Sequence, residues 1–546
     1  MAELVSSKST QNLEQGVRKR RAPLPRLGTL LGLWLPGLLV AGGVLLPIAY
    51  LVLRASQADS AIWDLLLRTR TLEITLRTLW LAFSVTLASV AIAVPIAWLT
   101  TRSDIPYRRL WAVLTPLPLV IPSFVGAYLF ISTLGPRGLI QSWLEPLGVM
   151  RLPPVYGYPG AVFVLTMMSY PFVLLSARAA LQRMDPALEE AARSLGRGPW
   201  RTFWSVTLPQ MRPAVAAGAL LVALYVLRDF GAVSIMRYDT FTRAIYIQYQ
   251  NSFDRSTAAA LALVLVAITL LILLVEVRTR GRARYYSSTA KSSRPPTIVA
   301  LGRWRWPALI FCASIVMAAL VLPTGNLLYW LVRGLGAGEQ VNDLWLSAQN
   351  SITGSALAAL GAVVAALPVA ILDVRHPGKI SHLLERISYV AFALPGVVIA
   401  LALVFFGTNF ALFLYQTLPM LVFAYVLLFL PEAVGAVRTS LLQVHPSMEE
   451  AARSLGHKPF SVFRRITLPL VRPGIGAGAA LVFLTAMKEL PATLILAPYG
   501  FKTLATGVWS AVSEAFFAQA AAPALLIILV SSIPLAFILL RENKQE

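Results

Sequence analysis

The octapeptide EEAARSLG occurs at Glu189–Gly196 and again at Glu449–Gly456 in a chain of 546 residues, so the two copies are offset by 260 positions. Each copy is followed by a TLPxxRP segment, at Thr207–Pro213 and at Thr467–Pro473. These polar segments stand out in an otherwise apolar chain. Their repetition indicates that one structural unit is written twice and that both copies do the same task.

The repeat extends well beyond the octapeptide. Pro171 aligns with Pro431 at the same offset, whereas Pro122 aligns with Pro395 at an offset of 273. Both octapeptides fall in basic loops, so the two halves have the same orientation. This predicts a pseudo-two-fold axis along the membrane normal. The predicted divisions are a basic tail (1–29), a first half (30–277), a linker (278–305), a second half (306–540) and a second tail (541–546).

The composition predicts an all-α membrane protein. Hydrophobic residues make up 57% of the chain, charged residues only 13%, and the mean hydropathy is +0.70. A helix needs roughly 20 apolar residues to cross a bilayer, and twelve runs approach or exceed that length, six in each half. The runs are 30–53, 78–100, 111–134, 159–176, 213–227, 258–275, 307–332, 351–372, 387–406, 411–430, 474–498 and 518–540.

The formal net charge of +22 lies mainly in alternate loops. This alternation follows the positive-inside rule and predicts a multi-pass protein of a bacterial-type inner (plasma) membrane with both termini in the cytoplasm. The basic residues do not form one face interleaved with aromatic residues, so we expect no nucleic-acid partner. The single cysteine, Cys312, excludes an internal disulfide. The first 26 residues are expected to be a disordered tail without a cleavable signal peptide.

The first polar segment has the features of a short amphipathic helix. Asp185 can cap it, Pro186 suits its first position, and Gly196 can end it with a positive φ. An interfacial helix in the headgroups and a protein-docking helix both fit this pattern, but identity between the copies favours docking. Phe203 and Phe463 should add exposed apolar surface. The predicted stripes are Leu188, Ala191, Ala192 and Leu195, and Met448, Ala451, Ala452 and Leu455.

Both segments resemble the EAA loop of ABC importer permeases, the membrane subunits served by an extracytoplasmic binding protein. The resemblance implies a type I ABC importer permease-like fold and two ATPase partner subunits, one on each loop. The expected ATPase-coupling residues are Glu189, Glu190, Ala191, Ala192 and Gly196 in the first half, and Glu449, Glu450, Ala451, Ala452 and Gly456 in the second.

The chain has no GxxxxGK[ST] phosphate-binding loop. We therefore expect a non-catalytic subunit that binds no cofactor and is driven by ATP and Mg²⁺ used in separate ATPase subunits, through rigid-body movement of the loops. The four histidines, His376, His382, His445 and His457, are dispersed among predicted cytoplasmic loops, so no fixed metal site is expected.

Five ionisable residues lie within or at the ends of apolar spans: Arg228, Asp229, Glu432, Lys488 and Glu489. Such groups are costly in a membrane and face a partner or a water-filled path. Two interpretations stay open. The residues either neutralise one another between helices or form candidates for the translocation path that attracts a cation. Pro122 and Pro395 should kink the helices that contain them.

The fused architecture and the segment 487–525 resemble the ferric iron permeases of ABC importers, which implies iron as the substrate. Asp229, Glu432 and Glu489 would supply the hard oxygen donors that ferric ion prefers. Thiamine is the nearest alternative, since Tyr170, Tyr225 and Tyr425 could form an aromatic cage; another small solute such as an oxyanion also stays open. A secondary transporter, driven by an ion gradient, is a lower alternative, because such a protein would have no need for two loops that bind ATPase subunits. A membrane-embedded enzyme is not favoured, because the spans of this chain contain no cluster of polar groups that could form an active site.

Overall fold

The computed structural model describes residues 27–56, 68–136, 138–251, 256–279, 298–339 and 343–543. The predicted disordered tail at 1–26 and most of the predicted linker lie outside the described residues. Within the described ranges the regular structure is helical, and β-pairing is limited to one isolated bridge between Ser103 and Val299. The predicted all-α class is confirmed.

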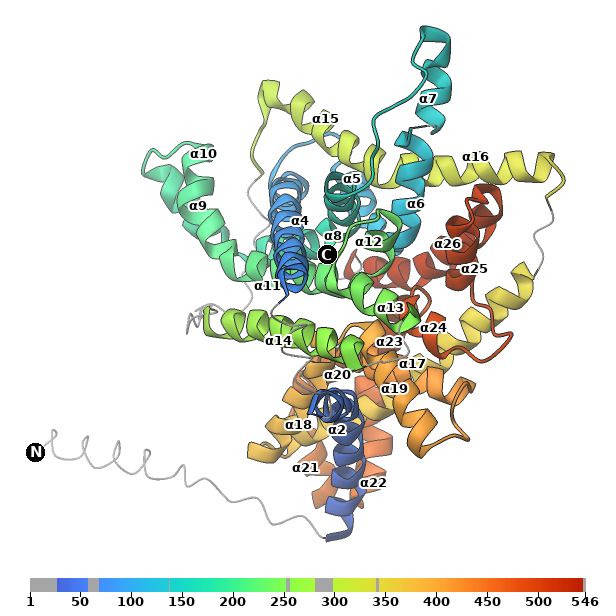
Figure 1. Cartoon of the computed structure of the whole chain (residues 1–546). Helices are drawn as coiled ribbons and strands as arrows, with labels where there is room; N and C mark the ends of the chain where they lie inside the picture. The colour runs from blue at the N-terminus through green and yellow to red at the C-terminus, as the bar shows by residue number, and fades with distance from the viewer. Residues whose placement is uncertain are drawn as a thin grey trace, which may run out of the picture.

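Twelve α-helices form the first half in the described part of the chain (Figure 1). They are α2 (Leu27–Ser56), α4 (Thr69–Arg102), α5 (Arg108–Leu114), α6 (Ser123–Leu134), α7 (Leu139–Leu144), α8 (Tyr158–Arg183), α9 (Pro186–Ser194), α10 (Pro199–Thr202), α11 (Leu208–Arg228), α12 (Gly231–Ile235), α13 (Phe241–Asn251) and α14 (Ser256–Thr279).

The described helices of the second half follow a matching order. They are α15 (Arg305–Val316), α16 (Leu322–Gly336), α17 (Leu344–Arg375), α18 (Lys379–Val390), α19 (Gly396–Phe410), α20 (Leu418–Gln443), α21 (Pro446–Ser454), α22 (Pro459–Val462), α23 (Leu468–Ala486), α24 (Pro491–Leu496), α25 (Leu504–Ser513) and α26 (Phe517–Asn543).

Nine helices of the described residues are long and apolar enough to cross a membrane, or eleven if each of two bent pairs forms one span. The bent pairs turn by 100° next to Pro122 and by 106° next to Pro395. Proline lacks an amide hydrogen and restricts the residue before it, so a helix readily breaks there. The predicted kinks are therefore confirmed, but the prediction of unbroken spans at 111–134 and 387–406 is wrong.

Two other predicted spans have different limits in the structure. Residues 411–417 form turns, and the span predicted from 411 begins only at Leu418. The span predicted to extend to about Pro498 ends at Ala486, and the short helix α24 begins at Pro491. Proline has no amide hydrogen to continue the preceding helix, so the apolar run divides there. The last predicted span corresponds to α26.

The two halves exchange their first helices. Helix α2 packs against α17, α18 and α19 of the second half as well as against α14 of its own, while α16 packs against α6 of the first half as well as against α26 of its own. Figure 1 shows the same exchange: the blue α2 lies among the orange helices, and the yellow α15 and α16 lie over the blue and green ones. The two packed bodies therefore differ from the two sequence halves, and separating them would expose apolar surface on both.

Each body surrounds one central helix, α8 or α20, and these two are the most buried of the candidate spans. Helix α8 contacts α4 and α11, and α20 makes the matching contacts with α17 and α23. The outer side of α4 carries a stripe of exposed apolar side chains, which suits contact with lipid tails rather than water. The stripe is Leu72, Leu76, Trp80, Phe83 and Leu87.

Candidate functional site

The repeated segments form the two helices that the sequence predicts, α9 and α21. The Asp185 carboxylate accepts a hydrogen bond from the Ala187 amide at 2.9 Å, and Pro186 occupies the first helical turn. In the second copy His445 replaces the aspartate, and its Nδ1 accepts a hydrogen bond from the Ser447 amide at 3.3 Å. The local sequence therefore determines the start of each helix.

Both helices end at a glycine with left-handed backbone geometry. The φ angle is +79° at Gly196 and +84° at Gly456. A Cβ atom at either position would meet no heavy atom within 4 Å. The requirement for glycine thus comes from the backbone and not from crowding, which confirms the predicted geometry of both turns.

A buried glutamate fastens the first loop to the membrane helices. The Glu189 side chain is only 3% exposed and accepts a hydrogen bond from the Thr207 hydroxyl at 2.8 Å. The Arg102 Nη1 atom at the end of α4 lies 4.0 Å from the other carboxylate oxygen, and Arg102 also donates to the Leu181 carbonyl at 3.0 Å. A buried carboxylate with these partners fixes the position of α9.

The second loop repeats this arrangement. The Glu449 carboxylate accepts hydrogen bonds from the Thr467 hydroxyl and from Arg375 Nε, both at 3.0 Å. Arg375 also donates to the Val444 carbonyl at 3.0 Å. The arginine and threonine partners were not predicted from the sequence, although Arg102 and Arg375 are related by the same 273-residue offset as Pro122 and Pro395.

The exposed surface of each loop is apolar at its tip. Leu188 and Leu195 are 52% and 80% exposed, and the matching Met448 and Leu455 are 48% and 81% exposed. Glu190, Ala191, Glu450 and Ala451 are also exposed, whereas Ala192 and Ala452 are buried. The predicted stripe is therefore only partly available: the second alanine of each copy packs inward and cannot contact a partner.

The prediction that Phe203 and Phe463 are exposed is wrong, because both are half-buried. The Phe203 ring packs against Trp98, with the ring centroids 6.0 Å apart. The exposed aromatic residues are their neighbours Trp200, at 72%, and Phe460, at 74%. These rings enlarge the apolar tip beside α9 and α21.

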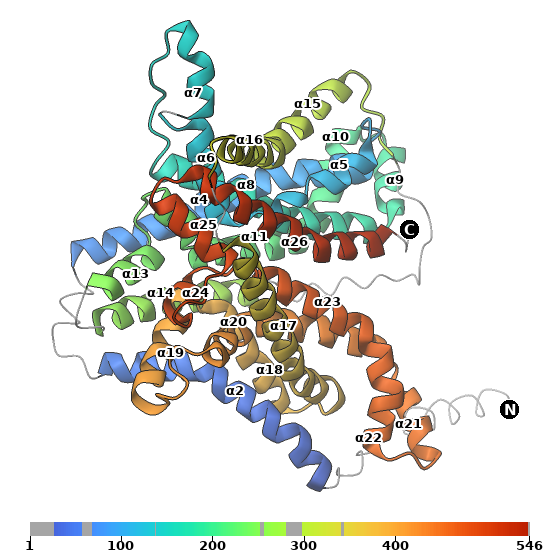
Figure 2. The same cartoon turned by 90° about the vertical axis from the view of Figure 1, so that its right-hand side faces the viewer.

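Each loop continues directly into a membrane-spanning helix. The helical stretches run without a break over Pro199–Arg228 and Pro459–Ala486, with π-helical turns at Phe203–Thr207 and Phe463–Thr467. Figure 2 shows both loops at the same end of the molecule, with α9 and α10 on one body and α21 and α22 on the other. A displacement of either loop is therefore transmitted to its span.

The ionisable residues of the spans come together where the two halves meet. The Lys488 ammonium group donates to the Leu119 carbonyl of the first half at 2.9 Å. Glu432 accepts a hydrogen bond from Thr485 at 3.0 Å. Arg228 of the first half interacts electrostatically with both Glu432 and Glu489 of the second. The structure thus brings four of the five candidate residues into one cluster between the halves.

Asp229 and Glu489 also cap short helices. Asp229 accepts hydrogen bonds from the amides of Ala232 and Val233 in α12, and from the Ser123 hydroxyl. Glu489 accepts one from the amide of Ala492 in α24. These bonds satisfy amides in the first turns of α12 and α24 and so favour the start of those helices.

The partners of these two caps differ in size. Asp229 faces Ser123, whereas the longer Glu489 faces Gly396, where an added Cβ would lie 2.3 Å from its oxygen. Since 123 and 396 differ by 273, these are matching positions in the two halves. Gly396 has no side chain and therefore leaves room for Glu489, whereas Ser123 faces the shorter Asp229.

The pair Glu432 and Thr485 has no copy in the first half, whereas Lys488 and Glu489 correspond to Arg228 and Asp229. Counting back 260 positions from Glu432 and Thr485 gives Phe172 and Tyr225, whose rings pack with centroids 5.6 Å apart. One half therefore contributes an acid and a hydroxyl to this level of the interface, and the other contributes two aromatic rings.

The three tyrosines considered for thiamine lie in different surroundings. Tyr170 on α8 is fully buried and donates to the Thr115 carbonyl at 2.5 Å. Tyr425 on α20 is 3% exposed, and its hydroxyl lies 2.6 Å from that of Thr493. Tyr425 also lines a small cavity with Glu489, whereas Tyr225 packs against Phe172. The three rings therefore have different partners.

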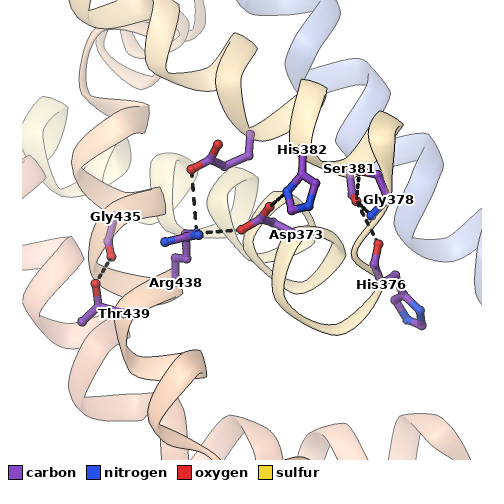
Figure 3. Close-up of polar contacts among 9 residues, drawn as sticks. Asp373, His376, Gly378, Ser381, His382, Gly435, Arg438 and Thr439 are labelled. Atoms are coloured by element: carbon purple, nitrogen blue, oxygen red, sulfur yellow. Dashed lines mark hydrogen bonds and ion pairs between the residues drawn. The ribbon is translucent and has the colours of Figure 1, made fainter. Parts of the chain in front are cut away.

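A second polar network lies at the end of α17, α18 and α20 (Figure 3). The Asp373 carboxylate accepts a hydrogen bond from Arg438 Nε at 2.6 Å, and its other oxygen lies 2.7 Å from His382 Nδ1. In the first half the matching Arg178 donates to the Ala112 carbonyl instead, at 2.7 Å. This network joins three helices of the second half.

The histidines do not gather. His382 lies inside α18 and not in a loop as predicted, whereas His376 ends α17 and His445 caps α21. Among the described residues, no group of three or more histidine, cysteine or carboxylate side chains could hold a metal ion.

Comparison with known proteins agrees with the internal repeat. A family described as "Binding-protein-dependent transport system inner membrane component" matches residues 89–284 and again residues 358–541. The chain is 38% identical over 508 residues to the "Fe(3+)-transport system permease protein FbpB 2" of Haemophilus influenzae, a match that covers 92% of this chain and 97% of that protein.

Other relatives match less completely. The "Ferric transport system permease protein FbpB" of Actinobacillus pleuropneumoniae is 24% identical over 84% of this chain and 70% of its own. The "Molybdenum transport system permease protein ModB" of Escherichia coli is 36% identical over 27% of this chain and 63% of its own. With two matched segments that together cover more than half of its length, the chain belongs to the family of binding-protein-dependent transport system inner membrane components.

Proposed function

We propose that this chain is the membrane subunit of an ATP-driven importer that carries ferric iron inward. Two copies of an ATPase subunit bind the two loops on the cytoplasmic side, and an extracytoplasmic binding protein delivers the iron. The observation that carries this proposal is the 38% identity to a protein named as an Fe(3+)-transport permease, across 97% of that protein's length.

The geometry of the loops supports the ATP-driven part. Two apolar tips of the same design, each fixed by a buried glutamate, face outward at the same end of the molecule. A closing movement of two bound ATPase subunits would pull both loops together. Because each loop continues into a long helix, that movement would tilt α11 and α23 and open the path toward one side and then the other.

The two carboxylates of the polar cluster support a cation as the substrate, and Arg228 and Lys488 lie near them with the opposite charge. Glu432 lies between the halves with one hydroxyl donor, and Glu489 is half-buried beside it. Carboxylate oxygens are hard donors that suit ferric ion, and so few of them would not trap it. The buried positions of Tyr170 and Tyr425 argue against the aromatic cage that thiamine would favour.

Disruption of this chain in its own cell tests the proposal. Uptake of radiolabelled ferric iron should fall to the background level and return when the intact chain is restored, while thiamine uptake should be unchanged. Normal iron uptake in the disrupted cells would contradict the assignment, and a loss of thiamine uptake alone would replace it.

A further inference from the structure

A cavity of about 370 Å³ lies between the two halves, at the end of the molecule opposite the loops that contain α9 and α21. Helices α6, α12 and α13 of the first half form one side, and α25 with the start of α26 forms the other. Figure 2 shows α13 and α25 on the side away from α9 and α21. A volume of this size suits a small ligand and exceeds what a bare metal ion requires.

The charged residues that line the cavity are both arginines, and no carboxylate is among its lining residues. Arg243 forms an ion pair with Asp239 one helical turn away. The Arg237 guanidinium lies over the Tyr156 ring at 5.2 Å, and within the described residues no carboxylate lies within 4.0 Å of it. Arg237 is exposed and therefore supplies a positive charge that no carboxylate of the described residues pairs with.

Two further features mark this site as built for a ligand. Arg237 has a left-handed backbone, with φ at +54°; such strained residues gather at functional sites. Ser234 also lines the cavity, and its hydroxyl oxygen is buried behind the cavity surface and has no hydrogen-bond partner in the described structure. A buried hydroxyl without a partner is costly unless a ligand or water supplies one.

The side chains of this site are not repeated at the matching positions of the second half. Ser234 and Arg237 correspond to Leu494 and Ala497 at the 260-residue offset. Arg243 corresponds to Thr506, because the amides of Phe241 and Leu504 donate to the matching hydroxyls of Thr78 and Ser351. The shared framework of the repeat therefore does not require the arginines. A single positive site, shared by both halves, fits one ligand for each transport cycle.

We propose that this cavity receives ferric iron as an anionic complex, with an oxyanion or carboxylate ligand of the iron bound to Arg237. This inference rests on the proposed iron transport. A triply charged cation alone would be repelled by Arg237, which has no described carboxylate within ion-pair distance, whereas guanidinium groups bind phosphate and carboxylate oxygens in pairs.

The complete transporter, reconstituted in lipid vesicles with its ATPase and binding protein, provides the test. Initial uptake of ⁵⁵Fe is measured in a non-coordinating buffer, with added phosphate, and with added citrate, so that the two anion sources are distinguished. In the intact protein at least one anion should raise uptake. Arg237→Gln should remove that increase, lowering the rate about tenfold, the usual loss for one charged hydrogen bond.

Two other variants make the result specific. Arg237→Lys keeps the charge and should retain part of the anion effect, which a purely structural role would not produce. Arg151→Gln removes an exposed arginine that does not line the cavity and should have no effect. Basal ATP hydrolysis and the amount of inserted protein should be the same in all variants.

The outcomes separate this inference from the proposed function. If the intact protein takes up no ⁵⁵Fe under any condition, the proposed iron transport fails. If it takes up ⁵⁵Fe equally well without anions, and Arg237→Gln transports as fast as the intact protein, the anionic-complex proposal fails while iron transport stands. Uptake of labelled phosphate without iron would overturn both the proposed iron transport and the anionic-complex proposal.

Discussion

Replacing Gly196 and Gly456 with valine should uncouple the loops from the membrane helices. Both glycines have φ near +80°, and a Cβ atom there would meet no neighbour, so the effect comes from the backbone alone. A residue with a Cβ in this conformation costs about 1–2 kcal/mol, and valine lies at the upper end because of its branched Cβ. Each substitution should therefore disfavour the native turn by roughly 5- to 30-fold.

The two turns are in separate loops, so their effects should add, giving a cost of about 2–4 kcal/mol in the double variant. We expect substrate uptake and binding-protein-stimulated ATP hydrolysis to be lost in reconstituted vesicles, with normal amounts of inserted protein. The single variants should differ in severity, because RGPW follows α9 in one loop and HKPF follows α21 in the other.

Gly198 provides a matched control in the first loop. Its φ is −64°, and an added Cβ would also meet no atom within 4 Å. Gly198→Ala should therefore leave uptake unchanged. The reasoning would be refuted if the double valine variant transported at the normal rate, or if Gly198→Ala lowered uptake as strongly.

Two other predictions follow from the loop contacts and the linker. Thr207→Val and Thr467→Val should remove the hydroxyl donor of the buried carboxylates of Glu189 and Glu449, at a cost of about 1–3 kcal/mol each. ATP hydrolysis coupled to transport should therefore fall in both variants. The Ser205→Ala variant, at an exposed position of the same loop, should hydrolyse ATP at the normal rate. Asp104 accepts hydrogen bonds from the Leu301 amide and Arg305, which lower its pKa below the usual 3.8. The contact of Asp104 with Leu301 and Arg305 therefore stabilises the fold fully above pH 3.8, and this stabilisation is lost as the pH falls through the lowered pKa of Asp104. Proteolysis near residue 300 should therefore be faster at a pH below that pKa than at neutral pH. The Asp104→Asn variant, which has no carboxylate to titrate, should be cleaved at the same rate at both of these pH values.

The features that the sequence predicted correctly are local ones. The caps at Asp185 and Pro186 and the positive φ at Gly196 depend on a few adjacent residues, so short-range rules were sufficient. The breaks at Pro122 and Pro395 were predicted as kinks for the same reason. The internal repeat gave the order of the two halves, because it needs only self-comparison of the chain.

The features that the sequence did not predict depend on contacts between distant segments. Arg102, Glu189 and Thr207 come from three separate helical segments, so no local pattern joins them. Hydropathy alone also does not show that Glu489 accepts a hydrogen bond from α24, so the predicted span 474–498 extends beyond Ala486, where α23 ends. The exchange of α2 and α16 between the halves likewise depends on which helices pack against each other. An apolar run in the sequence predicts a membrane span but not its neighbours.

The number of ATPase subunits bound to one chain tests the central claim most directly, because the account rests on two docking loops of the same design. Native mass spectrometry of the complex, purified through this chain in lipid-like detergent, measures that number. The account predicts one copy of this chain with two copies of one ATPase subunit. A complex with a single ATPase, or a stable transporter with none, would contradict it.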